Sequence, residues 1–148
     1  MAFPFSIEGT VAIKTTDLMS TISAVESAIR KAKPTDMIRD GAKIRFRAGL
    51  FRLATNWNLL VPIGSGQLLF SQEADRVLIH YSLSLVQLFV TSTLLVAIML
   101  GIVPIFESEY PWACLGVMPL AWLWLFGANY LTTKFRFPRF LRTGSQPV

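Results

Sequence analysis

The sequence predicts an α+β protein in which a small N-terminal antiparallel sheet with one helix is followed by a two-helix transmembrane hairpin. Segments of the first half alternate between apolar and polar residues, as half-buried strands do. One segment of that half instead repeats apolar residues at helical spacing. In the second half, residues 77–106 and 110–133 contain no Asp, Glu, Lys or Arg. These observations divide the chain into a domain over residues 1–81, a hairpin over 82–132 and a basic tail over 133–148.

The first predicted element is a strand over residues 6–14. Its alternation puts apolar and polar side chains on opposite faces. The apolar face holds Ile7, Val11 and Ile13, and the polar face holds Ser6, Glu8, Thr10 and Lys14.

A helix is predicted over about residues 17–32. Asp17 is suited to accept hydrogen bonds from free N–H groups at a helix start. Apolar residues then follow at spacings of four, three and four, which makes one apolar face. They are Leu18, Ile22, Val25 and Ile29. Pro34 cannot continue the helix and ends it.

Three further strands are predicted between this helix and the first apolar run. Asp40-Gly41 is a turn signal, after which residues 43–48 alternate basic and apolar side chains. Residues 49–61 are compatible with a loop, a short helix or a bent strand, and residues 62–66 form a break. Residues 67–71 and 76–83 then have the pattern of a β-hairpin.

The two charge-free runs predict membrane helices over about residues 82–106 and 111–131. A helix of roughly 20 apolar residues crosses a bilayer core of about 30 Å. The connection at residues 107–110 has no Lys or Arg, whereas the tail has four. Because basic residues concentrate on the cytoplasmic side, both termini are expected in the cytoplasm. The predicted location is the bacterial cytoplasmic (inner) membrane, as a multi-pass protein.

Composition argues against a catalytic or metal site. The chain has one histidine, His80, and one cysteine, Cys114, which excludes an intrachain disulfide and the usual Cys/His metal clusters. Gly64-Ser65-Gly66 lacks the length and the lysine of a phosphate-binding loop. We therefore expect no catalytic residues, no metal and no cofactor. Despite a net charge of +5, binding to nucleic acid is not expected, because the basic tail would lie against a membrane.

A group of polar residues is predicted to connect the two apolar helices. Within a bilayer, polar side chains prefer to face another helix, where hydrogen bonds are available. If the first helix begins by residue 80, four of these residues share one face. Gln87 lies at a depth similar to Asn129, and a contact between the two is predicted to fix the register of the hairpin. The alternative is a polar path or a seam for another membrane subunit. The residues are His80, Ser84, Gln87, Thr91 and Asn129.

Two basic groups are candidate binding surfaces. In the tail, basic residues interleave with aromatic ones and suit anionic lipid headgroups, although they could serve only to set topology. They are Lys134, Arg136, Arg139 and Arg142. A basic strand face with one nearby arginine is either solvated or a contact for an acidic partner. It comprises Lys43, Arg45, Arg47 and Arg52.

The leading functional hypothesis is a non-enzymatic integral membrane protein, an accessory subunit or scaffold that presents a small cytoplasmic domain at the membrane surface. One alternative is a membrane-anchored sensory module that binds a ligand or lipid between helix 17–32 and the sheet. A weaker alternative is a minor subunit of a transporter. Expected partners are anionic membrane lipids and either a membrane protein or further copies of this chain.

Overall fold

The computed structural model describes residues 5–47, 63–106 and 111–145, and for residues 100–106, 111–115 and 118 it describes the backbone only. Within these ranges the chain forms a five-stranded antiparallel sheet and three helices. The strands are β1 (Ser6–Lys14), β2 (Asp36–Asp40), β3 (Lys43–Arg47), β4 (Ser65–Glu73) and β5 (Arg76–Ser84). The helices are α1 (Leu18–Lys31), α2 (Val86–Phe106) and α3 (Pro111–Gly144).

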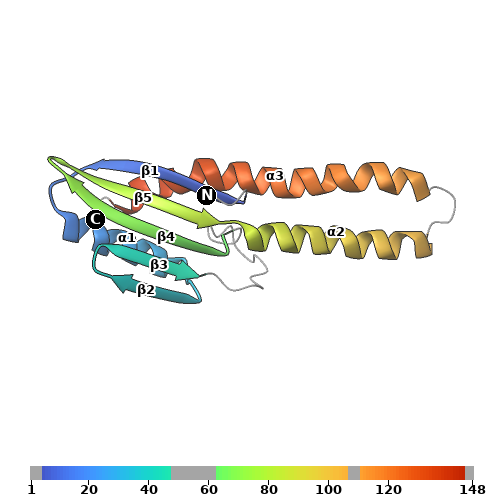
Figure 1. Ribbon diagram of the computed structural model, residues 1–148, viewed down its shortest axis with the longest axis horizontal. Helices are drawn as coiled ribbons and strands as arrows, with labels where there is room; N and C mark the ends of the chain where they lie inside the picture. Colours follow the sequence, from blue (N-terminus) through green and yellow to red (C-terminus); the bar gives the residue numbers. More distant parts are fainter. Residues whose placement is uncertain (1–4, 48–62, 107–110, 146–148) are drawn as a thin grey trace.

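The strand order in the sheet is β1-β5-β4-β3-β2, and every neighbouring pair is antiparallel. β2–β3 and β4–β5 are hairpins, whereas β1 pairs with a strand far from it in the sequence, β5 (Figure 1). In that pair Val11 lies opposite Ile79, and Gly9 lies opposite Tyr81. β1 and β2 are therefore the two edges of the sheet.

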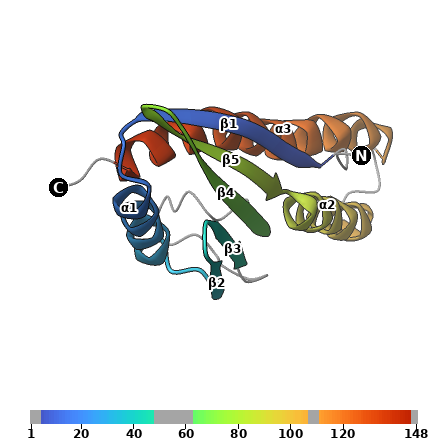
Figure 2. The same ribbon diagram turned by 60° about the vertical axis from the view of Figure 1, so that its left-hand side comes forward.

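One face of the sheet forms the hydrophobic core. α1 and the C-terminal part of α3 pack on this face, as Figure 2 shows. Because side chains alternate along a strand, the other face carries the polar residues. The buried residues include Ile7, Val11, Ile44, Phe46, Leu68, Phe70, Val77, Ile79 and Leu83 from the strands and Ile22, Val25, Ile29, Phe137 and Leu141 from the helices.

α1 confirms the helix predicted over residues 17–32. The Asp17 carboxylate accepts a hydrogen bond from the Ser20 backbone N–H at 3.1 Å, so it caps the helix. Ile22, Val25 and Ile29 are buried, as the apolar spacing predicts. The strand predictions over 6–14 and 43–48 correspond to β1 and β3, and the predicted hairpin corresponds to β4 and β5.

β2 was not predicted because its sequence lacks the alternation of a half-buried strand. It is an edge strand, and four of its five residues are exposed. Arg39 on β2 is turned toward α1, where it pairs with Glu26 at 3.1 Å. Because so little of β2 is buried, its sequence does not alternate between apolar and polar residues. The strand is held by pairing with β3.

α3 extends far beyond the predicted second helix and enters the core of the sheet domain. Phe137 and Leu141 are fully buried, and the Tyr81 and Phe137 rings lie 5.2 Å apart. The segment from residue 133 to residue 144 is thus the end of one 34-residue helix. Its basic residues lie on the exposed side of that helix.

The predicted transmembrane hairpin over residues 82–132 is wrong. In the part of the chain that the structure describes, none of the helices has the combination of length and apolar character needed to span a membrane. The first charge-free run does not form a single helix, because it begins as β5 and turns into α2 only at Val86. The second run is continuous with a basic, amphipathic segment that packs on the sheet.

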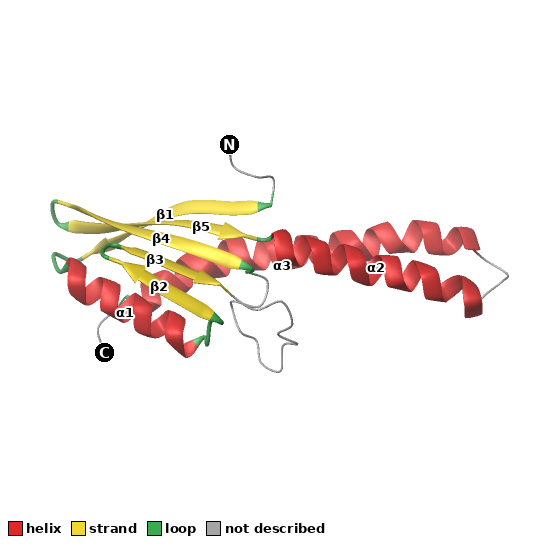
Figure 3. Ribbon diagram, turned by 60° about the horizontal axis from the view of Figure 1, so that its bottom comes forward, coloured by secondary structure: helices red, strands yellow, loops and turns green. Residues whose placement is uncertain are grey.

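The same finding overturns the predictions that depended on the hairpin. These are the integral membrane accessory subunit, the membrane-anchored sensory module, the minor transporter subunit and the multi-pass location in the bacterial inner membrane. α2 and the N-terminal part of α3 instead form a two-helix arm that projects from one end of the sheet domain (Figures 1 and 3).

Candidate interaction surfaces

The side of α3 that faces α2 is filled by contacts within the chain. The Phe89 and Trp122 rings meet edge to face at 5.7 Å, and Trp122 stacks on Phe126 at 5.2 Å. The Trp122 indole N–H also donates a hydrogen bond to the Thr93 hydroxyl at 3.1 Å. At the base of the arm, Phe5 stacks on Phe89 at 4.2 Å. This aromatic cluster fixes α2 against α3.

The opposite side of α3 is apolar and exposed. We call it the outer face of α3 and define it by Val117, Leu120, Trp124, Gly127 and Leu131. The spacings of three, four, three and four place these residues in one stripe along the helix. The side-chain-bearing members are 61%, 67%, 73% and 52% exposed in chain order. A contiguous apolar surface of this kind is typical of an interaction site.

Gly127 lies in open space within this stripe. A Cβ atom at Gly127 would have no neighbour within 4 Å, so no packing contact of the described chain requires a glycine there. Glycine in a helix interior costs roughly 1 kcal/mol relative to alanine. Small residues on helix surfaces allow another helix to approach closely. The position is therefore suited to a helix–helix contact outside the chain.

α2 adds further exposed apolar side chains to the arm. They are about half exposed and lie on several sides of the helix. They are Val90, Leu94, Leu95, Ile98 and Met99. The arm as a whole is thus more apolar at its surface than the sheet domain.

The polar face of the sheet forms a second candidate surface. A groove of about 560 Å³ crosses four strands, with Glu8 and Thr10 on β1 and Lys43 on β3. Within it, the Thr10 hydroxyl and His80 Nδ1 are hydrogen bonded at 2.8 Å. A second groove of about 350 Å³ shares Gln67 with the first. Both grooves are shallow surface features and carry charges of both signs.

The predicted polar group does not form one helical stripe. His80 and Ser84 belong to β5, whereas Gln87 and Thr91 belong to α2. The Thr91 hydroxyl donates to the Gln87 carbonyl at 2.8 Å, and the Asn129 side chain donates to the Leu125 carbonyl at 2.7 Å, each within its own helix. Gln87 lies against Gly64. The proposed contact of Gln87 with Asn129 stays a prediction.

Within the described residues, the two basic groups lie on different elements, one on β3 and the other on α3. Three of the strand residues, Lys43, Arg45 and Arg47, lie on the polar face of the sheet, and Arg52 lies outside the described residues. The other group is exposed along the C-terminal part of α3, and its role in binding lipid headgroups stays a prediction. It comprises Lys134, Arg136, Arg139 and Arg142.

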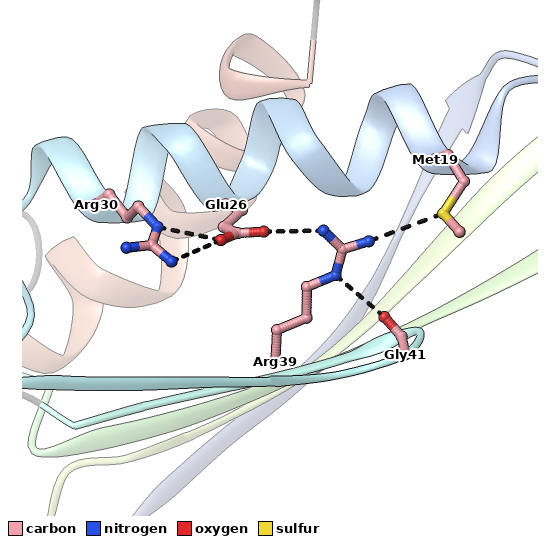
Figure 4. A network of polar contacts seen from close by, with 5 residues as sticks. All are labelled: Met19, Glu26, Arg30, Arg39 and Gly41. Atoms are coloured by element: carbon pink, nitrogen blue, oxygen red, sulfur yellow. Dashed lines mark hydrogen bonds and ion pairs between the residues drawn. The ribbon is translucent and has the colours of Figure 1, made fainter.

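Glu26 and Tyr81 have shifted pKa values with structural causes. The hydrogen bond from Arg30 lowers the pKa of Glu26 from its ordinary value, and Arg39 adds to this effect against the opposing effect of burial. Figure 4 shows this network, in which Arg39 also reaches the Gly41 carbonyl and the Met19 sulfur. Burial raises the pKa of the Tyr81 hydroxyl. The described residues contain no group of three potential His, Cys, Asp or Glu metal ligands.

Comparison with family models, with curated proteins and with solved structures gives no match. The function must therefore be argued from the surfaces of this chain.

Proposed function

We propose that this is a non-catalytic, self-assembling protein in which the outer face of α3 packs against the same face of a second copy. The observation that carries the proposal is the exposed apolar stripe on a helix whose other side is already packed. A stripe of this kind is stabilised by removal from water, at about 25 cal/mol per Å² of apolar area.

The chemistry of the stripe restricts its partner. No Asp, Glu, Lys or Arg occurs in residues 110–133, so a charged partner surface would lose its hydration without gaining an ion pair. An apolar helix meets no such penalty. The same face on a second copy is such a helix, and a two-fold axis brings identical surfaces together.

The geometry of the stripe also favours a helical partner. From Val117 to Leu131 the helix rises by about 21 Å. Alternate spacings of three and four give the 3.5-residue period of a coiled-coil seam. Gly127 provides the space for close approach of a second backbone.

The proposed absence of catalysis is supported by the causes of the shifted pKa values. Perturbed groups that serve catalysis usually converge in a cleft with a reaction partner. Here Glu26 belongs to a structural ion-pair network between α1 and β2. The pKa of Tyr81 is raised because its side chain is buried in the core. His80 is hydrogen bonded to Thr10 on an exposed strand face.

The proposal is tested by the oligomeric state of full-length variants in analytical ultracentrifugation. Leu120→Glu places a charge within the stripe, and Ile38→Glu is the matched control on β2. Both residues are exposed apolar ones, at 67% and 58%. Wild type and Ile38→Glu are expected to self-associate, whereas association of Leu120→Glu weakens by at least about tenfold. Circular dichroism checks that both variants remain folded.

Two results would overturn the proposal. One is a folded Leu120→Glu variant that associates as strongly as the wild type. The other is a wild-type protein that stays monomeric and floats with vesicles of phosphatidylcholine and phosphatidylglycerol, which would mean that lipid covers the stripe instead of a second copy.

A further inference from the structure

β1 is an edge of the sheet with a pairing partner on one side only among the described residues, and Figure 3 shows it as the outermost strand. At its start, the Leu85 N–H donates to the Phe5 carbonyl at 2.8 Å, which makes Phe5 and Leu85 a hydrogen-bonded pair. In an antiparallel ladder such pairs alternate with non-bonded ones. The odd-numbered residues of β1 therefore bond to β5.

The even-numbered residues point their backbone groups toward the open edge. They include Glu8, Thr10, Ala12 and Lys14, and all four are exposed. From Glu8 to Lys14, these N–H and C=O groups face no neighbouring strand among the described residues, and such a row is a template for another strand. α1 and the C-terminal part of α3 pack on the core face, where α3 contacts β1, and Arg142 and Ser145 line the same hollow as Ala12 and Lys14.

We infer that β1 pairs antiparallel with β1 of a second copy, which would join two sheets into one of ten strands. The bonding pattern allows a two-fold axis at Val11. In this register Glu8 lies opposite Lys14 of the second copy, Thr10 lies opposite Ala12, and the symmetry gives each pair twice. A register centred on Thr10 would instead place Glu8 opposite Ala12 and form no ion pair.

The charges around Lys14 favour the register centred on Val11. Within one copy, Lys14 lies directly opposite Arg76 on β5, and like charges in this position are destabilising. A carboxylate across the edge would offset this repulsion. Glu8 lies opposite Ser82, whose hydroxyl donates a hydrogen bond to the Glu8 carboxylate at 3.5 Å, and Glu8 has no ion pair among the described residues.

This contact is separate from the one proposed for α3. Antiparallel pairing of two β1 strands points the two arms in opposite directions, because each arm extends from the same end of its sheet (Figure 1). The outer face of α3 then stays accessible in both copies. The edge contact is therefore tested in the Leu120→Glu background, where association through α3 is weakened.

The test is a charge exchange read by sedimentation equilibrium of full-length protein. In the Leu120→Glu background, Glu8→Lys and Lys14→Glu each create two like-charge pairs and are expected to weaken the dimer by about tenfold or more. The double variant restores both ion pairs. An equimolar mixture of the two single variants restores them in the mixed dimer, and both samples are expected to regain the starting affinity within about threefold.

The inference is overturned if Leu120→Glu alone is monomeric at every accessible concentration. It is also overturned if the single exchanges leave the affinity unchanged, or if neither the double variant nor the mixture regains it. Failure of the α3 contact is read separately, from the comparison of Leu120→Glu with the wild type.

Discussion

Glu26 connects α1 to the edge strand β2 through two arginines. Its carboxylate lies 2.9 Å from Arg30 on the same helix and 3.1 Å from Arg39 on β2. The first contact is the i,i+4 pair that helical spacing predicts. The second joins residues 13 positions apart, and it depends on how β2 returns along α1. Sequence spacing therefore predicts the Glu26–Arg30 pair within α1. It cannot predict the Glu26–Arg39 pair, which connects α1 to the edge strand β2.

The lowered pKa of Glu26 predicts a stability change in acid. The unfolded chain binds this proton near pH 4.5, above the pKa of the folded state. The contribution is therefore complete above pH 4.5 and is lost as the pH falls through the folded pKa. Urea unfolding at neutral pH should show Glu26→Gln to be less stable by about 1 kcal/mol. Below the folded pKa this difference should shrink, and a difference that stays constant with pH would contradict the assignment.

α3 is an element with different roles along its length. Near its middle, one side packs on α2 and the other is the outer face, while its C-terminal part belongs to the core of the sheet domain. Phe137 and Leu141 are four residues apart, the spacing of one helical face. Their role was not predicted because aromatic and basic residues interleave there, which also fits a headgroup-binding tail. The outer face from Val117 to Leu131 was not predicted either, because most of the neighbouring residues in the sequence are also apolar and no single stripe stands out.

Packing of the C-terminal part of α3 on the sheet is tested by two alanine substitutions on that helix. Phe137 is fully buried, whereas Phe135 is 63% exposed. Phe137→Ala should lower the free energy of unfolding by about 3–5 kcal/mol because it leaves a cavity in the core. Phe135→Ala should change it by no more than about 0.5 kcal/mol. Equal effects in denaturant unfolding would show that this part of α3 does not pack as described.

At the scale of the whole molecule, alternation predicts strands but not their order. β1 and β5 pair although they are more than 60 residues apart in the sequence. Tyr81 on β5 then contacts Phe137 on α3 in the core. Hydropathy similarly identifies apolar helices without stating what covers them. The described helices contradict the membrane spans that were inferred from the two charge-free runs. The apolar surface of the arm is therefore exposed in a single copy of the chain. We assign the role of covering it to a second copy.

The most direct test is a distance between two copies at the outer face of α3. A spin label at Ala128→Cys, in a Cys114→Ser background without other cysteines, lies next to Gly127 of the stripe. Packed helices lie about 8–10 Å apart, so electron paramagnetic resonance should find labels within roughly 20 Å of each other in either helix orientation. Folded protein without dipolar coupling at any accessible concentration would show that the outer face of α3 does not pack against a second copy.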